Sequence, residues 1–212
     1  MSIIQGLIDF ILHIDEHLVE IIGRFGAWSY GILFAIVFVE TGIVIMPFLP
    51  GDSLLFAAGT LAALGAFNIY TLLIVFFIAA VIGDTVNYHI GKKVGMAIPP
   101  QSFLGRVVNK ERMETAQAFF NKHGGKTIVI ARFMPFIRTF IPFVAGASRM
   151  NYKYFIFYNV VGAFLWVMSC TLAGYFFGNI PIVKNNFSTV LILIIVISVL
   201  PAIIGAIRAR KK

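Results

Sequence analysis

The sequence places four ionisable side chains inside apolar stretches that prolines interrupt. The acids Glu40 and Asp52 stand on either side of one proline-containing break, and the arginines Arg132 and Arg138 stand on either side of another. A charged side chain at the centre of a bilayer costs about 2.5–3.5 kcal/mol on insertion scales, and proline breaks a helix. Because broken backbone at membrane depth is tolerated only inside protein or along a water-filled cavity, the four residues predict a polar site buried in a membrane.

The composition is that of an integral membrane protein. Of the 212 residues, 59% are hydrophobic and only 12% are charged, whereas soluble domains carry about 25% charged residues. The net charge of +8 does not indicate a nucleic-acid partner, because no contiguous soluble basic domain exists. The single cysteine, Cys170, excludes an intramolecular disulfide and a cysteine-rich metal site. We expect no metal and no cofactor.

The apolar runs divide the chain into hairpins, spans and polar connections. We predict an amphipathic N-terminal helix over 1–24, a membrane domain over 25–180, and a C-terminal span with a basic tail over 187–212. Within the membrane domain we expect a hairpin over 27–66, a span over 70–91, a cytoplasmic loop over 92–126, a second hairpin over 127–148 and a span over 154–178. The sequence leaves open whether residues 3–22 span the membrane or lie in its interface.

The basic residues favour re-entrant hairpins. They gather in the loop over 92–126, at Arg149 and Lys153, and in the tail after residue 207. Positively charged loops stay cytoplasmic. If residues 127–148 dip into the membrane and return, all three groups lie on the cytoplasmic side, whereas a full crossing would separate the loop from the tail. We therefore predict a re-entrant second hairpin and a cytoplasmic C-terminus.

The two halves of the membrane domain share one pattern. Each has a proline-broken hairpin followed by a span with an internal asparagine, Asn87 or Asn159. Inverted repeats with broken helices that meet at the midplane are typical of secondary transporters. The predicted fold class is an all-α integral membrane protein in which two proline-broken re-entrant hairpins form an inverted repeat beside spanning helices.

The arginine pair predicts an anion site. Arg132 and Arg138 would point about 120° apart on a continuous helix, but a break at Pro135 would let both reach one spot. Two guanidiniums suit phosphate or carboxylate. Glu40 and Asp52 are their natural partners when no anion is bound, and protonation of a carboxyl would release the arginines and couple anion movement to protons. The alternative is a static ion-pair network, although buried pairs stabilise poorly compared with apolar packing.

Other polar or small residues in the apolar segments have secondary roles in this hypothesis. Asp84, Asn87 and Asn159 are candidates for hydrogen bonds between helices or for a proton path, and Trp166 is expected to pack rather than to stack on a headgroup. The glycines expected to allow close helix packing are Gly83, Gly91, Gly146 and Gly162.

Several short motifs resemble those of the DedA family. They are Phe48-Leu49-Pro50-Gly51-Asp52, Gly83-Asp84-x3-Tyr88-x2-Gly91, Lys122-His123-Gly124, Ala131-Arg132-Phe133-x-Pro135-x2-Arg138, Pro142-x3-Gly146-x3-Met150, Phe155-x3-Asn159-x2-Gly162-x3-Trp166 and Gly174-Tyr175-x2-Gly178. The resemblance implies a bacterial inner-membrane protein with two opposed re-entrant hairpins. The essential acidic and arginine pairs of the family match Glu40 with Asp52 and Arg132 with Arg138.

The resemblance also bears on function. Members of the family are implicated in recycling undecaprenyl phosphate, in processes that depend on the proton motive force, and in envelope integrity, and related eukaryotic domains scramble phospholipids. The chain is therefore expected to be a multi-pass, proton-coupled translocase (flippase). Its partners would be protons and membrane lipids, and its substrate an anionic phospholipid or a polyprenyl phosphate.

Two other functions remain open: a proton-dependent small-ion or drug transporter, and a non-transport protein of membrane homeostasis. An enzyme is not expected, since residues 127–150 hold no His, Cys or Asp to act beside the arginines. The sequence does not decide the oligomeric state and leaves a homo-oligomer open.

Overall fold

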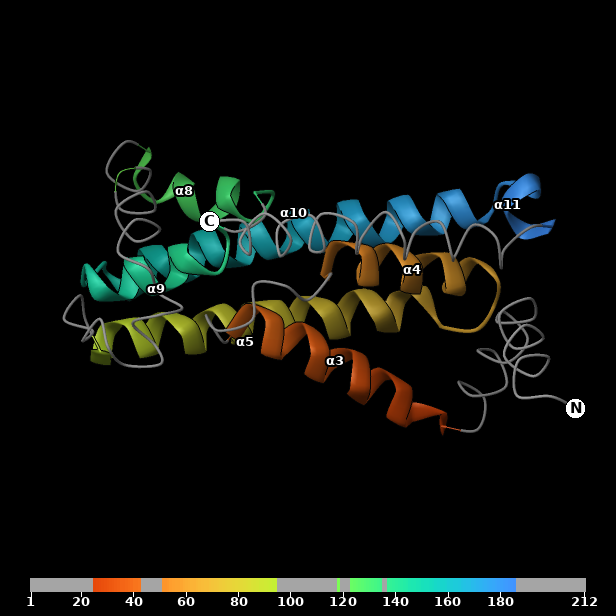
Figure 1. Cartoon of the computed structure of the whole chain (residues 1–212), viewed down its shortest axis with the longest axis horizontal. Coiled ribbons are helices and arrows are strands. Elements are labelled where there is room, and N and C mark those ends of the chain that lie inside the picture. Colours follow the sequence, from red (N-terminus) through yellow and green to blue (C-terminus); the bar gives the residue numbers. More distant parts are fainter. Residues whose placement is uncertain (1–24, 43–50, 95–117, 119–122, 135–136, 186–212) are drawn as a thin grey trace, which may run out of the picture. The chain divides into compact units, whose positions relative to one another are not determined.

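The computed structural model describes residues 25–42, 51–94, 118, 123–134 and 137–185 (Figure 1). The chain divides into two compact units. Unit 1 comprises Met1–Ile32, Pro50–Leu73 and Ser169–Lys212, and unit 2 comprises Leu33–Leu49 and Ile74–Met168. The predicted N-terminal helix, the C-terminal span and most of the loop over 92–126 lie outside the described residues.

Two long helices have the length and composition of membrane spans. Helix α5 runs over Ile69–Val94 and helix α10 over Tyr152–Gly178. At a rise of 1.5 Å per residue each is about 40 Å long, which exceeds the roughly 30 Å hydrocarbon core of a bilayer. Throughout the described residues the regular structure is helical. The prediction of an all-α membrane protein is confirmed to this extent.

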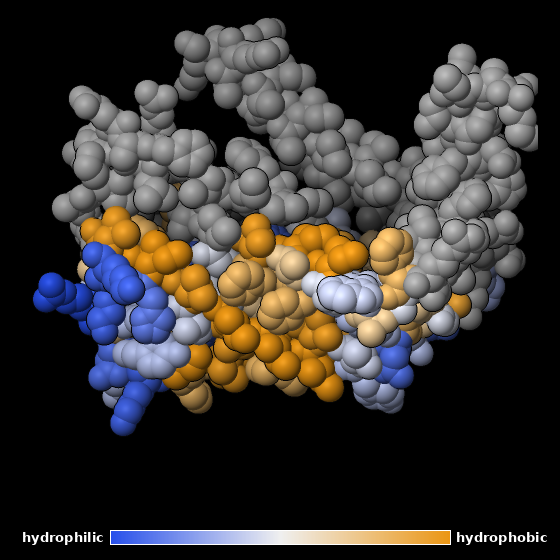
Figure 2. All heavy atoms as spheres, turned by 90° about the horizontal axis from the view of Figure 1, so that it is seen from below, coloured by the Kyte–Doolittle hydropathy of each residue, from blue (hydrophilic) through white to orange (hydrophobic). Residues whose placement is uncertain are grey.

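Large apolar side chains are exposed along both long helices. Ile74, Ile78 and Ile82 form an exposed stripe on α5, and Phe157 and Phe164 are exposed on α10. Hydrophobic residues accordingly fill much of the described surface in Figure 2. Apolar surface of this extent is rare on a soluble monomer, and it suits contact with lipid tails.

Shorter helices lie on either side of the predicted breaks. They are α3 (Ala27–Gly42), α4 (Gly51–Ala63), α8 (Lys126–Ala131) and α9 (Phe140–Ala147), and a last short helix, α11, covers Pro181–Asn185. Helix α8 ends and α9 begins on the two sides of Pro135, as the sequence predicted. None of these helices reaches the roughly 20 residues of a span. The re-entrant course of the hairpins and the inverted repeat stay predictions.

In unit 2, α5 lies antiparallel to α10 and against α9. Asn159 of α10 donates to the carbonyl of Val81 (3.0 Å), while Phe155 stacks on Tyr88, further along α5, with ring centroids 4.4 Å apart. Gly91 and Gly146 bring the backbones of α5 and α9 together, because a Cβ at either would collide with a carbonyl of the other helix. The predicted role of glycine in close packing is thus confirmed here.

In unit 1, glycines likewise bring the backbones of α4 and the end of α10 close together. A Cβ at Gly59 would collide with the carbonyl of Thr171, and one at Gly174 would collide with that of Phe56. The hydroxyl of Thr60 donates to the carbonyl of Gly174 (3.0 Å). Small residues that admit close backbone approach are typical of helix packing in membranes.

Candidate functional site

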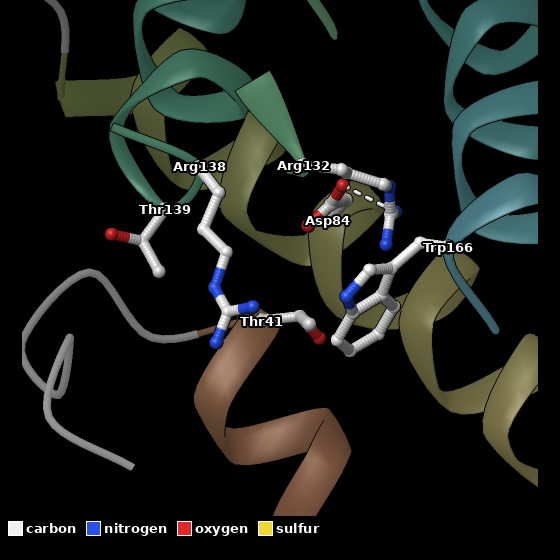
Figure 3. Close-up of a pocket in the computed structure, with 6 residues that line it drawn as sticks. All are labelled: Thr41, Asp84, Arg132, Arg138, Thr139 and Trp166. Carbon is white, nitrogen blue, oxygen red and sulfur yellow. Dashed lines mark hydrogen bonds and ion pairs between the residues drawn. The ribbon is translucent and has the colours of Figure 1, made fainter. Parts of the chain in front are cut away.

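A pocket in unit 2 collects polar side chains from four parts of the described chain. It encloses about 250 Å³ of empty space, open mouth included, and Figure 3 shows its lining. The lining residues are Thr41 of α3, Asp84 of α5, Arg132, Arg138 and Thr139 of the connection between α8 and α9, and Trp166 of α10. The two predicted arginines therefore lie in one pocket.

Regular α-helix is interrupted between the two arginines. Helix α8 stops at Ala131, and the amides of Phe133 and Met134 close turns onto the carbonyls of Ile130 (3.1 Å) and Ala131 (2.9 Å). Helix α9 does not begin until Phe140. A continuous helix would have pointed the arginines apart, so this interruption is what allows both to line the pocket.

Arg132 is buried among partners from both long helices. Its Nη2 donates to Asp84 Oδ2 (2.5 Å), to Asn159 Oδ1 (2.6 Å) and more weakly to the carbonyl of Ala80 (3.3 Å). Only 5% of its side chain is exposed, and only 6% of that of Asp84. Its Nε has no hydrogen-bond partner among the described residues. Arg132 is therefore fixed by an ion pair and an amide through Nη2.

Arg138 is paired with a different acid. Its Nη2 contacts Glu40 Oε1 in an ion pair. Glu40 lies near the C-terminal end of α3 with 1% of its side chain exposed, whereas 14% of the Arg138 side chain is exposed. Two guanidiniums and the Asp84 carboxylate thus line the pocket, and Glu40 lies beside Arg138, so that these four charges balance.

One face of α10 supports the arginines. Asn159 accepts from Arg132, and a Cβ at Gly162 would come within 3.2 Å of Arg132 Cδ. The indole ring of Trp166 lies 5.8 Å from the Arg132 guanidinium and 5.4 Å from that of Arg138. Both distances allow cation–π attraction. Trp166 therefore contacts the two cations at once, which offsets part of their mutual repulsion.

Asn87 joins the end of α3 to the connection that carries the arginines. Its Nδ2 donates to the carbonyl of Thr139 (2.7 Å) and to that of Thr41 (3.3 Å). Asn87 is fully buried. The last carbonyls of a helix have no intrahelical partner, and Asn87 satisfies that of Thr41 near the end of α3. Its second bond, to Thr139 at the N-cap of α9, also ties that segment to α5.

The structure rearranges the partners expected from the sequence. It brings Arg132, Arg138 and Glu40 together, and it gives Arg132 the partner Asp84, which sequence reasoning had ranked as secondary. Asp52 lies in unit 1, in the first turn of α4, with an exposed side chain.

Sequence reasoning missed the contact of Trp166 with the guanidiniums. Asn159, Gly162 and Trp166 are spaced i, i+3 and i+7, which places them on one helix face. That spacing is the signal that could have found the contact.

Comparisons with known proteins agree with a membrane protein of this kind. The family model of the VTT domain matches residues 49–176. The chain is 49% identical over 215 residues to protein DedA of Escherichia coli K12, covering all of the chain and 97% of that protein. It is 41% identical over 184 residues to an uncharacterized membrane protein of Mycobacterium leprae (87% and 82% covered). It is 37% identical over 153 residues to the inner membrane protein YqjA of E. coli K12 (72% and 69% covered). No solved structure matches the chain.

Proposed function

This chain belongs to the DedA family of VTT-domain membrane proteins, and we propose that it is an inner-membrane translocase that moves a phosphate-bearing lipid in a proton-coupled way. One observation carries the proposal. Two guanidiniums line one buried pocket, and each is ion-paired with a carboxylate of the protein, Arg132 with Asp84 and Arg138 with Glu40. Two arginines at one spot suit the fork geometry and charge of a phosphate.

The charge balance supports coupling to protons. The buried arginines and carboxylates cancel, so an entering phosphate would add uncompensated negative charge to a poorly solvated pocket. A proton on Glu40 would remove one negative charge and release Arg138 for the phosphate. Loss of that proton would restore the ion pair and expel the anion. Anion and proton would then move together.

The size of the pocket favours a headgroup over a whole molecule. Its roughly 250 Å³ of empty space includes the open mouth, so the enclosed part can take only a small group. A phosphate group would enter while its hydrocarbon tail stays against the apolar surface outside. A polyprenyl phosphate such as undecaprenyl phosphate has this form, with a small anionic head on a long tail. The pocket size equally admits free phosphate, so a small-anion exchanger is the second candidate.

We propose transport and not catalysis. The six lining residues offer cations, one carboxylate, hydroxyls and an indole. These groups can hold and release an anion, but phosphatase chemistry would want an activated nucleophile beside the arginines.

Reconstituted protein tests the proposal. Liposomes would carry undecaprenyl phosphate, and its movement to the opposite leaflet would be followed with and without an imposed pH gradient. A second set of liposomes would enclose inorganic phosphate. We expect Arg138→Ala to slow lipid movement roughly 10–100-fold, which corresponds to one charge-assisted hydrogen bond. Arg138→Lys, which keeps the charge without the fork, should lie between wild type and Arg138→Ala.

The matched control is Lys126→Gln. Lys126 is an exposed cation at the start of α8, outside the pocket, so its loss should leave the rate unchanged. Movement of inorganic phosphate without movement of the lipid would establish the small-anion exchanger instead. If folded protein moves neither, or if Arg138→Ala equals wild type, the proposal is contradicted.

A further inference from the structure

Three helix ends of unit 2, all remote in sequence from α3, meet at one place. They are the last turns of α5, the C-terminal turn of α9 and the first turn of α10. The Tyr88 hydroxyl donates to the carbonyl of Met150 (2.5 Å), and the rings of His89 and Tyr152 lie 5.4 Å apart. A Cβ at Gly146 would lie 2.8 Å from the amide nitrogen of Lys92. These contacts place the three turns side by side.

The three turns carry only positive formal charge. Lys92, Lys93, Arg149 and Lys153 are all exposed, and we call them the basic cluster. No Asp or Glu occurs in residues 85–94 or 139–158. Figure 2 shows hydrophilic residues gathered at the left, at the end where α5 ends and α10 begins. Like charges held together without acids in their own turns favour an anionic partner.

Arg149 occupies a backbone conformation that suits glycine. Its φ is +54°, and it follows the C-cap residue Ser148 of α9. The amide of Arg149 donates to the carbonyl of Gly146 (2.9 Å), and that of Met150 donates to the carbonyl of Ala145 (3.0 Å). This is a Schellman motif, whose left-handed position is usually glycine or asparagine. A residue with a side chain raises the free energy of the folded state by about 1–2 kcal/mol in this conformation. The protein therefore has an arginine at a position where glycine would make the fold more stable.

The basic cluster lies where a membrane surface would be. It stands at the ends of both apolar helices long enough to span a bilayer. Tyr152 (38% exposed) and Tyr154 (66% exposed) begin α10, and such aromatic residues sit at headgroup level in membrane proteins. Each Lys or Arg near an anionic membrane surface contributes about 1 kcal/mol of attraction.

We infer that the basic cluster is a binding site for the headgroups of anionic phospholipids in the adjacent leaflet, with Arg149 as its phosphate ligand. The strained turn carries Arg149 at the place where the end of α5, with its two lysines, meets the start of α10, with Lys153. A guanidinium offers two parallel donors to a phosphate, whereas lysine offers a point charge. This inference stands apart from the buried pocket and does not depend on transport.

Substitutions at Arg149 separate lipid binding from backbone strain. Thermal unfolding would be measured in nanodiscs of phosphatidylcholine and in nanodiscs that also contain phosphatidylglycerol, and bound phosphatidylglycerol would be counted by native mass spectrometry. Arg149→Gly and Arg149→Asn should raise the unfolding midpoint in phosphatidylcholine, because both residues accept this φ. Both should reduce the stabilisation by phosphatidylglycerol and weaken its binding about five-fold, the equivalent of one such charge.

Arg149→Lys keeps the charge and the strain but loses the fork, so it should retain only part of the stabilisation by phosphatidylglycerol, without the higher midpoint. The inference is overturned if phosphatidylglycerol does not stabilise the wild type, or if Arg149→Gly keeps the full stabilisation. It is also overturned if Arg149→Gly lowers the midpoint in phosphatidylcholine, since Arg149 would then support the fold.

Discussion

Arg132 is held by side chains from two long helices, whereas Arg138 is paired with an acid near the end of a short one. Asp84 and Asn159, the partners of Arg132, lie within α5 and α10. Glu40, the partner of Arg138, lies two residues before α3 ends. The exposed fraction of the arginine side chain rises from 5% at Arg132 to 14% at Arg138. The two cations share a pocket but differ in exposure and in the helices that carry the partners described here.

This difference suggests that the two arginines have different roles. A group fixed inside packed helices cannot change partners without disturbing the core. A more exposed group whose partner stands near a helix end can exchange that partner at lower cost. We therefore expect changes around Arg132 to act mainly on stability, and changes around Arg138 to act mainly on transport and its coupling.

The largest expected effect is that of Asp84→Ala. It leaves the Arg132 guanidinium buried without its ion pair, and breaking a buried pair from one side costs about 3–5 kcal/mol. Chemical unfolding in detergent micelles would measure the loss. Asp84→Asn, which keeps a hydrogen-bond acceptor, should lose less. If Asp84→Ala proves no more destabilising than Glu40→Ala, the two arginines are held equally and the comparison fails.

A second prediction concerns the helix face behind Arg132. An alanine Cβ at Gly162 would lie 3.2 Å from both Arg132 Cδ and Val129 Cα, so Gly162→Ala should destabilise by roughly 1–3 kcal/mol, as overpacking does. Gly31→Ala is the matched control, because no atom of the described residues lies within 4 Å of its Cβ position. Gly31→Ala should stabilise by up to about 1 kcal/mol through helix propensity. Equal responses in an unfolding titration would show that α10 does not confine Arg132.

Glu40→Gln should have a smaller effect on stability and a clear effect on coupling. The amide keeps the shape of the side chain, and Arg138 is exposed enough for water to compensate part of its charge. Since glutamine cannot take up a proton, transport rates with and without a pH gradient should become equal. The measurement is the liposome assay with the gradient imposed in both directions. A variant that still responds to the gradient would move the coupling role away from Glu40.

The sequence was sufficient to predict that Glu40, Arg132 and Arg138 are largely buried and that the helix breaks near Pro135, whereas Asp52 is exposed. Charged residues and prolines inside apolar runs are rare enough to be informative, and the end of α8 near Pro135 follows from them. The pairing of Arg132 with Asp84 did not follow, because periodicity does not reveal which faces of α5 and α10 meet the break. The contact of Trp166 with the two guanidiniums was not predicted for a related reason. An aromatic residue in an apolar helix usually packs against other apolar side chains, and whether it meets the arginines depends on where the helix break lies.

Asp52 gives the smallest expected change in stability and the sharpest test of the acid pair. It is exposed in the first turn of α4, where an acid stabilises a helix by about 0.3–1 kcal/mol. Asp52→Asn should therefore cost at most about 1 kcal/mol. If Asp52 shares proton coupling with Glu40, the same substitution should also remove the response of transport to the gradient.

Asn68→Ala is the matched control for Asp52→Asn. The Asn68 side chain accepts from the amide of Thr71 (3.1 Å) at the start of α5, and loss of such a cap costs about 1 kcal/mol. The control should thus lose comparable stability in the same unit yet keep the gradient response. If transport by Asp52→Asn still responds to the pH gradient, Asp52 only stabilises the start of α4, and Glu40 is the acid whose protonation releases Arg138. Coupling lost in both variants would mean that the assay reports stability and not proton exchange.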